Sequence, residues 1–286
     1  MRLCFFNDNR LGLVEGDSVR DVTAAITAPR SAHYPFPVHD VFVAELPGIC
    51  KRIANLADDG RRIGVAELAL LPPVLNPGKL VAAPVNYQAH LDEAIEDHAT
   101  FSRANVRKIQ ETGLFLKATS SLIGVSAPIL IAHPDRRTDH EIELAAIIGR
   151  KCYRVQRSDA LSYVAGYTIG LDITIRGPEE RSLRKSLDSY SVLGPWLVTA
   201  DEFGDPSDHE MTLHVDGELR QHANTRDLIM DVAELIAFAS SYYTLMPGDV
   251  IFTGTPEGVG PIRPGNRIDA QIRGIGSLTM EVRENG

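Results

Sequence analysis

The apolar segment from Asp139 to Gly149 contains two glutamates at alternate positions, Glu141 and Glu143. Its branched apolar residues, closed by a glycine, predict a buried β-strand. Because strand side chains alternate between faces, the two carboxylates point the same way. On a buried face they would repel each other, and a bound cation is the simplest way for both to stay ionised. A strand with one solvated face is the alternative, and the pair alone does not exclude it.

A third carboxylate, Asp172, stands in another apolar and β-branched segment, residues 166–176. An unpaired charge in such a strand would be costly, so Asp172 needs a partner. The simpler possibility is an ion pair with Arg176, four residues later. The other is a cluster of Asp172 with Glu141 and Glu143. An all-oxygen set without cysteine favours Mg²⁺, Mn²⁺ or Ca²⁺ over zinc, and it leaves positions open for substrate and water.

Two further groups could perform proton transfer and charge stabilisation. His90 and Glu93 are three residues apart, so they share a face of a helix, where the carboxylate would orient the imidazole as a general base. Lys185 could neutralise an oxyanion near a metal. A solvated His–Glu pair and a surface lysine are the ordinary alternatives, and spacing alone does not decide between them.

A glycine-rich segment, residues 253–260, follows a predicted strand and includes Gly254 and Thr255. Glycines let backbone amides approach an anion closely, and a substrate carboxylate is the anion expected here. The segment lacks the Gly-Lys-Ser/Thr ending of a P-loop and does not open a helix as a Rossmann turn does. A plain hairpin turn is the alternative.

The elements that must position these groups are mostly strands. Residues 1–14 predict a hairpin, residues 40–60 predict a helix, and prolines 72, 73 and 77 mark a boundary. After it, short strands alternate with turns, interrupted by a helix with Asp231 as its N-cap. The polar segment near residues 88–112 is expected to be a surface helix or a lid. We therefore expect a small N-terminal α/β domain (1–75) and a larger domain (76–286).

Composition narrows the class of protein. The 286 residues are 44% hydrophobic and 23% charged, with a net charge of −9, which is typical of a globular protein and makes nucleic acid an improbable partner. Three widely spaced cysteines predict free thiols in a reducing compartment. The sequence starts without a signal-peptide pattern and contains no membrane-spanning run, so a cytoplasmic protein without a membrane partner is expected.

An ordered series of motifs connects these candidates: Asn86-Tyr87-x-x-His90-x-x-Glu93, Phe115-Leu116-Lys117, Glu141-x-Glu143-Leu144, Gly166-Tyr167, Asp172, Arg176, Lys185-Ser186, Gly194-Pro195-Trp196, Pro247-Gly248-Asp249 and Thr253-Gly254-Thr255-Pro256-x-Gly258-Val259-Gly260. Through this series the chain resembles the fumarylacetoacetate hydrolase family over roughly residues 79–283. The resemblance implies an α+β, mostly β fold, a mixed β-sandwich roll, usually found as a homodimer. It also implies a divalent ion, typically Mg²⁺, with Mn²⁺ or Ca²⁺ as alternatives.

The resemblance also implies roles for individual residues. The metal ligands would be Glu141, Glu143 and Asp172. His90 and Glu93 would activate water, and Lys185 would stabilise the oxyanion. The residues implied to bind the substrate are Tyr87, Lys117, Arg176, Gly254 and Thr255.

The expected activity is hydrolysis of the C–C bond of a 1,3-diketo acid, such as maleylpyruvate, fumarylpyruvate or fumarylacetoacetate, in the breakdown of aromatic compounds. The substrate partner would be a small dicarbonyl acid. Isomerisation or decarboxylation of a 2-hydroxydienoate, of the 2-hydroxyhepta-2,4-diene-1,7-dioate type, is the alternative within the family. The His90–Glu93 pair favours hydrolysis, because a tautomerase needs no activated water. A metal-binding protein without turnover is the remaining possibility.

Overall fold

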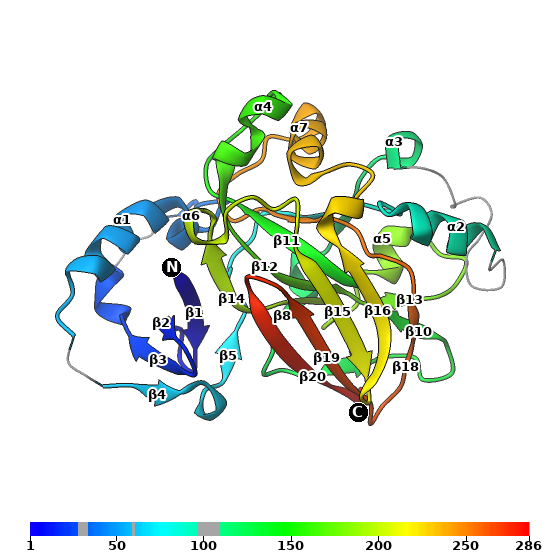
Figure 1. Ribbon diagram of the computed structural model, residues 1–286, viewed down its shortest axis with the longest axis horizontal. Helices are drawn as coiled ribbons and strands as arrows, with labels where there is room; N and C mark the ends of the chain where they lie inside the picture. The colour runs from blue at the N-terminus through cyan, green and yellow to red at the C-terminus, as the bar shows by residue number, and fades with distance from the viewer. Residues whose placement is uncertain (28–33, 59–60, 97–108, 286) are drawn as a thin grey trace.

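The computed structural model of the chain describes residues 1–27, 34–58, 61–96 and 109–285. Strands dominate the described residues, and three sheets organise them (Figure 1). The expected α+β, mostly β class is confirmed. None of the helices in these ranges is both long and apolar enough to cross a bilayer.

The N-terminal strands form one end of the largest sheet, at the left of Figure 1. They are β1 (Arg2–Phe6), β2 (Arg10–Glu15), β3 (Ser18–Asp21), β4 (Ile63–Gly64) and β5 (Leu70–Leu71). The predicted hairpin is confirmed, because β1 pairs antiparallel with β2. Helix α1 (Val41–Asn55) begins after Asp40, whose side chain accepts a hydrogen bond from the Val43 amide and caps the first turn.

The rest of the largest sheet positions the acidic residues. Its strands are β6 (Leu80–Ala82), β7 (Phe115–Lys117), β8 (Leu122–Ile123), β11 (Ile142–Ile148), β12 (Val164–Asp172), β14 (Ser191–Thr199) and β17 (Val250–Phe252). Within the described residues the sheet has 12 strands in the order β4-β3-β2-β1-β14-β12-β11-β17-β6-β7, with β5 beside β1 and β8 beside β14. Lys117 of β7 contacts Asp172 of β12, although three strands separate β7 from β12 in this order. The sheet is therefore rolled.

A second sheet packs against the first, in yellow and red in Figure 1. Its order is β16 (Glu218–Asn224), β15 (Glu210–Val215), β19 (Arg267–Ile272), β20 (Gly276–Glu284) and β9 (Ile129–Ile131). A small sheet joins β13 (Thr174–Ile175), β10 (Thr138–His140) and β18 (Gly260–Ile262).

The remaining helices cover the ends of the sheets. They are α2 (Gln88–Glu96), α3 (Ile109–Thr112), α4 (Arg157–Ala160), α5 (Arg181–Arg184), α6 (Ala200–Phe203) and α7 (Val232–Tyr242). The predicted N-cap of α7 is confirmed, because Asp231 and Glu234 form a capping box. Of the segment expected to be a lid, residues 97–108 lie outside the described residues.

Strand β11 separates two hydrophobic cores. Ile142, Leu144, Ala146 and Ile148 pack into a core with the second sheet and α7. Ala145 and Ile147 pack on the opposite face with α1 and the N-terminal strands. Because side chains alternate, Glu141 and Glu143 belong to this opposite face. The N-terminal domain expected over residues 1–75 stays a prediction, and its strands continue the sheet that carries these glutamates.

Candidate active site

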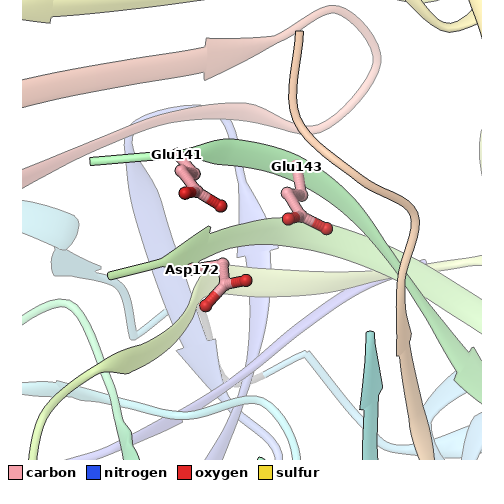
Figure 2. A group of neighbouring side chains, drawn as sticks. All are labelled: Glu141, Glu143 and Asp172. Carbon is pink, nitrogen blue, oxygen red and sulfur yellow. The ribbon is translucent and has the colours of Figure 1, made fainter. Parts of the chain in front are cut away.

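Three carboxylates converge at the ends of two neighbouring strands. Glu141, Glu143 and Asp172 each offer an oxygen within 4.8 Å of the others, and all three side chains are buried. Figure 2 shows Glu143 on β11 and Glu141 directly before that strand, with their carboxylates on the side of Asp172, the last residue of β12. The Asp172 amide donates to the Glu141 carbonyl over 2.9 Å, so this backbone pairing sets the cluster. The buried strand excludes the alternative of a solvated Glu-x-Glu face.

Burial and mutual repulsion act unequally on the three acids. Desolvation, then the charges of Asp172 and Glu141, raise the pKa of Glu143 well above its usual range. Burial alone would also raise the pKa of Glu141, but Lys185 and Arg176 outweigh it and hold that pKa below its usual range. The cluster therefore carries one carboxyl that binds a proton tightly unless another cation replaces it.

Two lysines approach the cluster from other strands and loops. The Lys185 ammonium group donates to Glu141 Oε2 (2.7 Å), Asp172 Oδ2 (2.6 Å) and Thr174 Oγ1 (2.6 Å). Lys117 donates to the other oxygen of Asp172 and to the Tyr190 carbonyl. Both lysines are buried, which excludes a surface role for Lys185. Burial lowers the pKa of Lys117.

Arg176 is a third cationic residue beside the acidic cluster. Its guanidinium donates to Asp139 Oδ2 (2.6 Å) and Glu141 Oε1 (3.1 Å). Of the two alternatives for Asp172, an ion pair with Arg176 or a place in the acidic cluster, the structure favours the cluster, and the ion pairs of Asp172 are with the two lysines. Arg176 instead binds Glu141 and Asp139. Asp139 also accepts a hydrogen bond from Arg137.

The cluster fits a hard divalent cation. Its donors are carboxylate oxygens, and Glu143 lies close enough to the other two acids for repulsion to raise its pKa. A cation among the three oxygens would remove that repulsion. The ligand set would be Glu141, Glu143 and Asp172, and the flanking lysines have flexible stems that allow their ammonium groups to turn toward a substrate.

His90 and Glu93 form a pair on α2. His90 Nδ1 lies 3.0 Å from Glu93 Oε2, and His90 is only 4% exposed. The other oxygen of Glu93 accepts a hydrogen bond from the Gly258 amide (3.1 Å). Glu93 therefore joins the helix to the glycine-rich segment and holds the imidazole, in contrast to a solvated surface pair. The glycine-rich segment that binds Glu93 through Gly258 also binds Glu143 through Gly254, which places the pair next to the cluster.

The glycine-rich segment lies beside the acids. The Gly254 amide donates to Glu143 Oε2 over 2.6 Å. Gly254 has φ of +98°, and a Cβ there would come within 2.7 Å of Asn86 Cβ, so the turn requires glycine. Thr255 is buried, and its hydroxyl accepts a hydrogen bond from Gln221.

Tyr87 lies differently from the other predicted site residues. Its hydroxyl donates to Met211 Sδ over 3.8 Å, and the ring is 1% exposed. Burial raises the pKa of Tyr87. The structure thus directs the ring into the core, while its neighbour Asn86 ties the start of α2 to Met230 and Thr253.

Sequence reasoning missed three contributors. Thr174 bonds Lys185 and Glu141, and its place two residues after Asp172 on the same strand face could have identified it. Arg181 lies over the Phe115 ring beside Lys185, and its position one helical turn before Lys185 was an available signal. Gln221 had no local signal, because its contacts reach across two sheets.

Comparisons with known proteins agree with this geometry. A family model described as "Fumarylacetoacetate (FAA) hydrolase C-terminal" matches residues 79–283. The chain is 52% identical over 285 residues to a maleylpyruvate hydrolase of Aquipseudomonas alcaligenes, covering 99% of both chains. It is 38% identical over 225 residues to a 2,4-didehydro-3-deoxy-L-rhamnonate hydrolase of a Sphingomonas strain, covering 74% of this chain and 75% of the relative.

A solved structure shares the architecture along the whole chain. The maleylpyruvate hydrolase of Sphingobium sp. SYK-6, described in complex with manganese(II) and pyruvate, superposes with a TM-score of 0.85 at 40% identity and full coverage of both chains. A 2-hydroxyhepta-2,4-diene-1,7-dioate isomerase of Mycobacterium marinum superposes with a TM-score of 0.71 at 30% identity, covering 100% of this chain and 99% of the other. The chain therefore belongs to the fumarylacetoacetate hydrolase family.

Proposed function

We propose that this protein is a metal-dependent hydrolase that cleaves the C–C bond of an acylpyruvate, with maleylpyruvate as its substrate. The observation that carries the proposal is the buried Glu141–Glu143–Asp172 cluster with His90–Glu93 beside it. The full-length similarity to a maleylpyruvate hydrolase supports the choice of substrate. Aromatic-ring breakdown supplies such diketo acids.

The proposed ion is Mg²⁺ or Mn²⁺, with Ca²⁺ a weaker candidate. Manganese in the Sphingobium relative supports a divalent ion of this kind. When bound, such an ion acts as a Lewis acid for the 2-keto acid end of the substrate and lowers the energy of the pyruvate enolate as a leaving group.

His90 is the proposed general base. Glu93 accepts from Nδ1, so Nε2 of the neutral ring is left with the lone pair that can take a proton from water. The resulting hydroxide attacks the distal carbonyl carbon, and the C–C bond to the pyruvate methylene then breaks. Glu93 is held by Gly258, which keeps the imidazole in one orientation.

Lys185 is the proposed oxyanion partner. Its ammonium group carries three donors and lies among the ligand oxygens, within reach of a substrate bound there. Charge that develops on the attacked carbonyl oxygen is stabilised only in the transition state, which raises turnover. Lys117, Arg176, Gly254 and Thr255 are proposed to hold the pyruvate carboxylate and keto oxygens. Tyr87 is proposed to support the site through packing.

The charges around the cluster favour a substrate with two carboxylates. Arg181 Cζ lies 5.4 Å from the centroid of the Phe115 ring, and Lys185 Nζ lies 5.6 Å from the same centroid. The two residues are one turn apart, joined by the backbone bond from the Lys185 amide to the Arg181 carbonyl. A maleyl group places a carboxylate near the carbonyl that Lys185 serves, because its double bond is cis. Arg181 is therefore the proposed partner of that carboxylate.

Isomerisation of a hydroxydienoate is the second candidate, supported by the likeness to the Mycobacterium marinum isomerase. The two activities are separated by their products. Purified protein with Mg²⁺ or Mn²⁺ is expected to consume the enol absorbance of maleylpyruvate and release one pyruvate per substrate, and a chelator should stop both. Loss of absorbance without pyruvate would support the isomerase, and no change would support a metal-binding protein without turnover.

We also propose that the protein is a cytoplasmic homodimer. The proposal rests on the family resemblance and on the similarity to a bacterial catabolic enzyme. Size-exclusion chromatography with light scattering should give twice the mass of one chain. A monomeric mass at micromolar concentration would overturn the dimer.

A further inference from the structure

Gln221 is a buried amide that links three parts of the site. It lies on β16 of the second sheet and is 1% exposed. Its Oε1 accepts from the Ile142 amide (3.0 Å) and lies 3.1 Å from His140 Nδ1. Its Nε2 donates to Thr255 Oγ1 (2.8 Å) and to the Pro256 carbonyl (3.0 Å). Every polar position of the side chain is thus used.

Two backbone groups fix the orientation of this amide. The Ile142 N–H can only donate, so the atom facing it must be the amide oxygen. The Pro256 carbonyl can only accept, so the atom facing it must be the amide nitrogen. The opposite orientation would oppose donor to donor and acceptor to acceptor in a buried place, which is costly.

This orientation determines what the Thr255 hydroxyl can do. A threonine hydroxyl has one hydrogen and two lone pairs, and here Gln221 Nε2 donates to one lone pair. The hydroxyl hydrogen must therefore point away from Gln221. Thr255 follows Gly254, whose amide binds the proposed metal ligand Glu143, so the hydroxyl belongs to the residue next to that contact.

We infer that Gln221 is a positioning residue that turns the Thr255 O–H into a hydrogen-bond donor for the substrate's pyruvate carboxylate. The inference rests on the proposed function, in which Thr255 contacts that carboxylate. A donor prepared in advance loses little freedom when the anion binds.

The same amide also keeps the ligand strand and the glycine-rich segment together. Ile142 stands between Glu141 and Glu143, so its bond to Gln221 fixes the backbone that carries both acids. Gly258 lies so close to β16 that a Cβ on it would stand 2.0 Å from the Arg220 carbonyl oxygen. The glycine-rich segment, which binds Glu93 through Gly258, therefore packs against β16, the strand that carries Gln221.

A double-mutant cycle tests the inference through pyruvate binding. Gln221→Met and Thr255→Val are made singly and together, and the pyruvate Kd is measured by calorimetry with saturating Mn²⁺. Each single change should raise the Kd about tenfold, the typical effect of losing a hydrogen bond to a charged group. The double variant should be no weaker than Thr255→Val, because Gln221 acts through the hydroxyl that Thr255→Val has already removed.

Gln221→Glu gives a second test that keeps the shape of the side chain. Its carboxylate accepts from both Ile142 and the Thr255 hydroxyl, so the hydroxyl hydrogen turns away from the substrate. We expect the Kd of pyruvate, and the KM more than the kcat, to rise about tenfold as in Gln221→Met. Thr255→Ser in the wild-type background should bind pyruvate nearly as the wild type does.

Two results would overturn the inference. One is an additive loss in the double variant, since a purely structural glutamine would weaken binding whether or not the hydroxyl is present. The other is wild-type pyruvate affinity in Gln221→Glu, which also decides the matter if Gln221→Met fails to fold. A wild-type protein that binds pyruvate but hydrolyses no acylpyruvate would refute the proposed function and leave the cycle readable.

Discussion

Lys185 Nζ lies 2.6 Å from Asp172 Oδ2, so a proposed oxyanion partner and a proposed metal ligand share a hydrogen bond. The same ammonium group also binds Glu141. Lys185 therefore neutralises part of the charge of Glu141 and Asp172, and the proposed reaction uses the same ammonium group to stabilise the oxyanion. Its removal should separate two quantities that usually fall together, turnover and metal affinity.

Lys185→Met is expected to lower kcat by about two to three powers of ten, the range seen when one oxyanion donor is removed. Its Kd for Mn²⁺ should stay equal or become smaller, because a competing cation has left the acids. Kinetics and calorimetry measure the two quantities. The exposed Lys151→Met is the matched control. Unchanged turnover in Lys185→Met would exclude Lys185 from the reaction.

His90→Gln is expected to lower kcat by about two to four powers of ten while the affinity for Mn²⁺ stays normal, because the ring takes a proton and binds no metal. The chain offers a matched control in His222, whose Nε2 lies 2.6 Å from Glu210 in an exposed pair. His222→Gln should turn over normally. Equal rates in the two variants would contradict the base assignment.

Asp172→Asn should abolish metal binding and activity together, because the neutral amide weakens the ligand set and removes a negative charge that two buried lysines contact. Metal affinity by calorimetry and pyruvate release measure the two effects. Asp269→Asn, in a pair with Arg267 away from the cluster, should retain both. Normal activity of Asp172→Asn would remove this residue from the site.

The raised pKa of Glu143 predicts that the stability of the metal-free protein depends on pH. Its pKa is raised in the folded state, so the folded protein holds this proton more tightly than the unfolded chain. The free energy of unfolding should therefore fall as pH rises above the ordinary glutamate pKa of about 4.3. Glu143→Gln should remove that part of the slope and raise the melting temperature at neutral pH in the presence of a chelator.

The same proton competes with the metal. In the wild type the apparent affinity for Mn²⁺ should increase with pH until Glu143 is deprotonated without metal. Glu143→Gln should bind Mn²⁺ weakly at every pH. The melting temperatures of Glu143→Gln and wild type are compared across pH in the presence of chelator. Identical values at every pH would show that the pKa of Glu143 is not raised in the folded protein.

Arg181→Gln tests the choice of a dicarboxylate. The ratio of kcat/KM for maleylpyruvate to that for acetylpyruvate, which lacks the second carboxylate, should fall about tenfold to a hundredfold. Arg181→Lys keeps the charge and should restore part of the ratio. An unchanged ratio in Arg181→Gln would place the second carboxylate elsewhere.

Local patterns were enough to predict the acidic face and several elements. Strand alternation predicted that Glu141 and Glu143 share a side, and capping preferences predicted the start of α7 at Asp231. The residues alone left two alternatives for Asp172, a cluster with this pair or an ion pair with Arg176, and the family resemblance favoured the cluster. The roles of these residues stay predictions, although the structure places their side chains together.

Contacts between sheets were beyond the reach of local patterns. Gln221 lies in a hairpin strand without a distinctive pattern. Its contribution to the site consists of hydrogen bonds with Ile142 and Thr255, which come close only after the sheets pack. The direction of the Tyr87 hydroxyl toward Met211 likewise depends on the second sheet. Sequence periodicity reports which face a residue occupies and carries no information about its partner across a core.

The pairing of β1 with β14 connects the N-terminal residues to the strands that carry the candidate site. β14 also pairs with β12, the strand of Asp172, and with the short β8, so trimming the chain before residue 76 would expose the β1 side of β14 at Leu197 and Val198, in the strand next to that of a proposed metal ligand. A shortened chain should aggregate or lose its hold on the ion even though none of the proposed site residues has been deleted. We therefore expect the smallest active fragment to be longer than the segment that contains the proposed site residues.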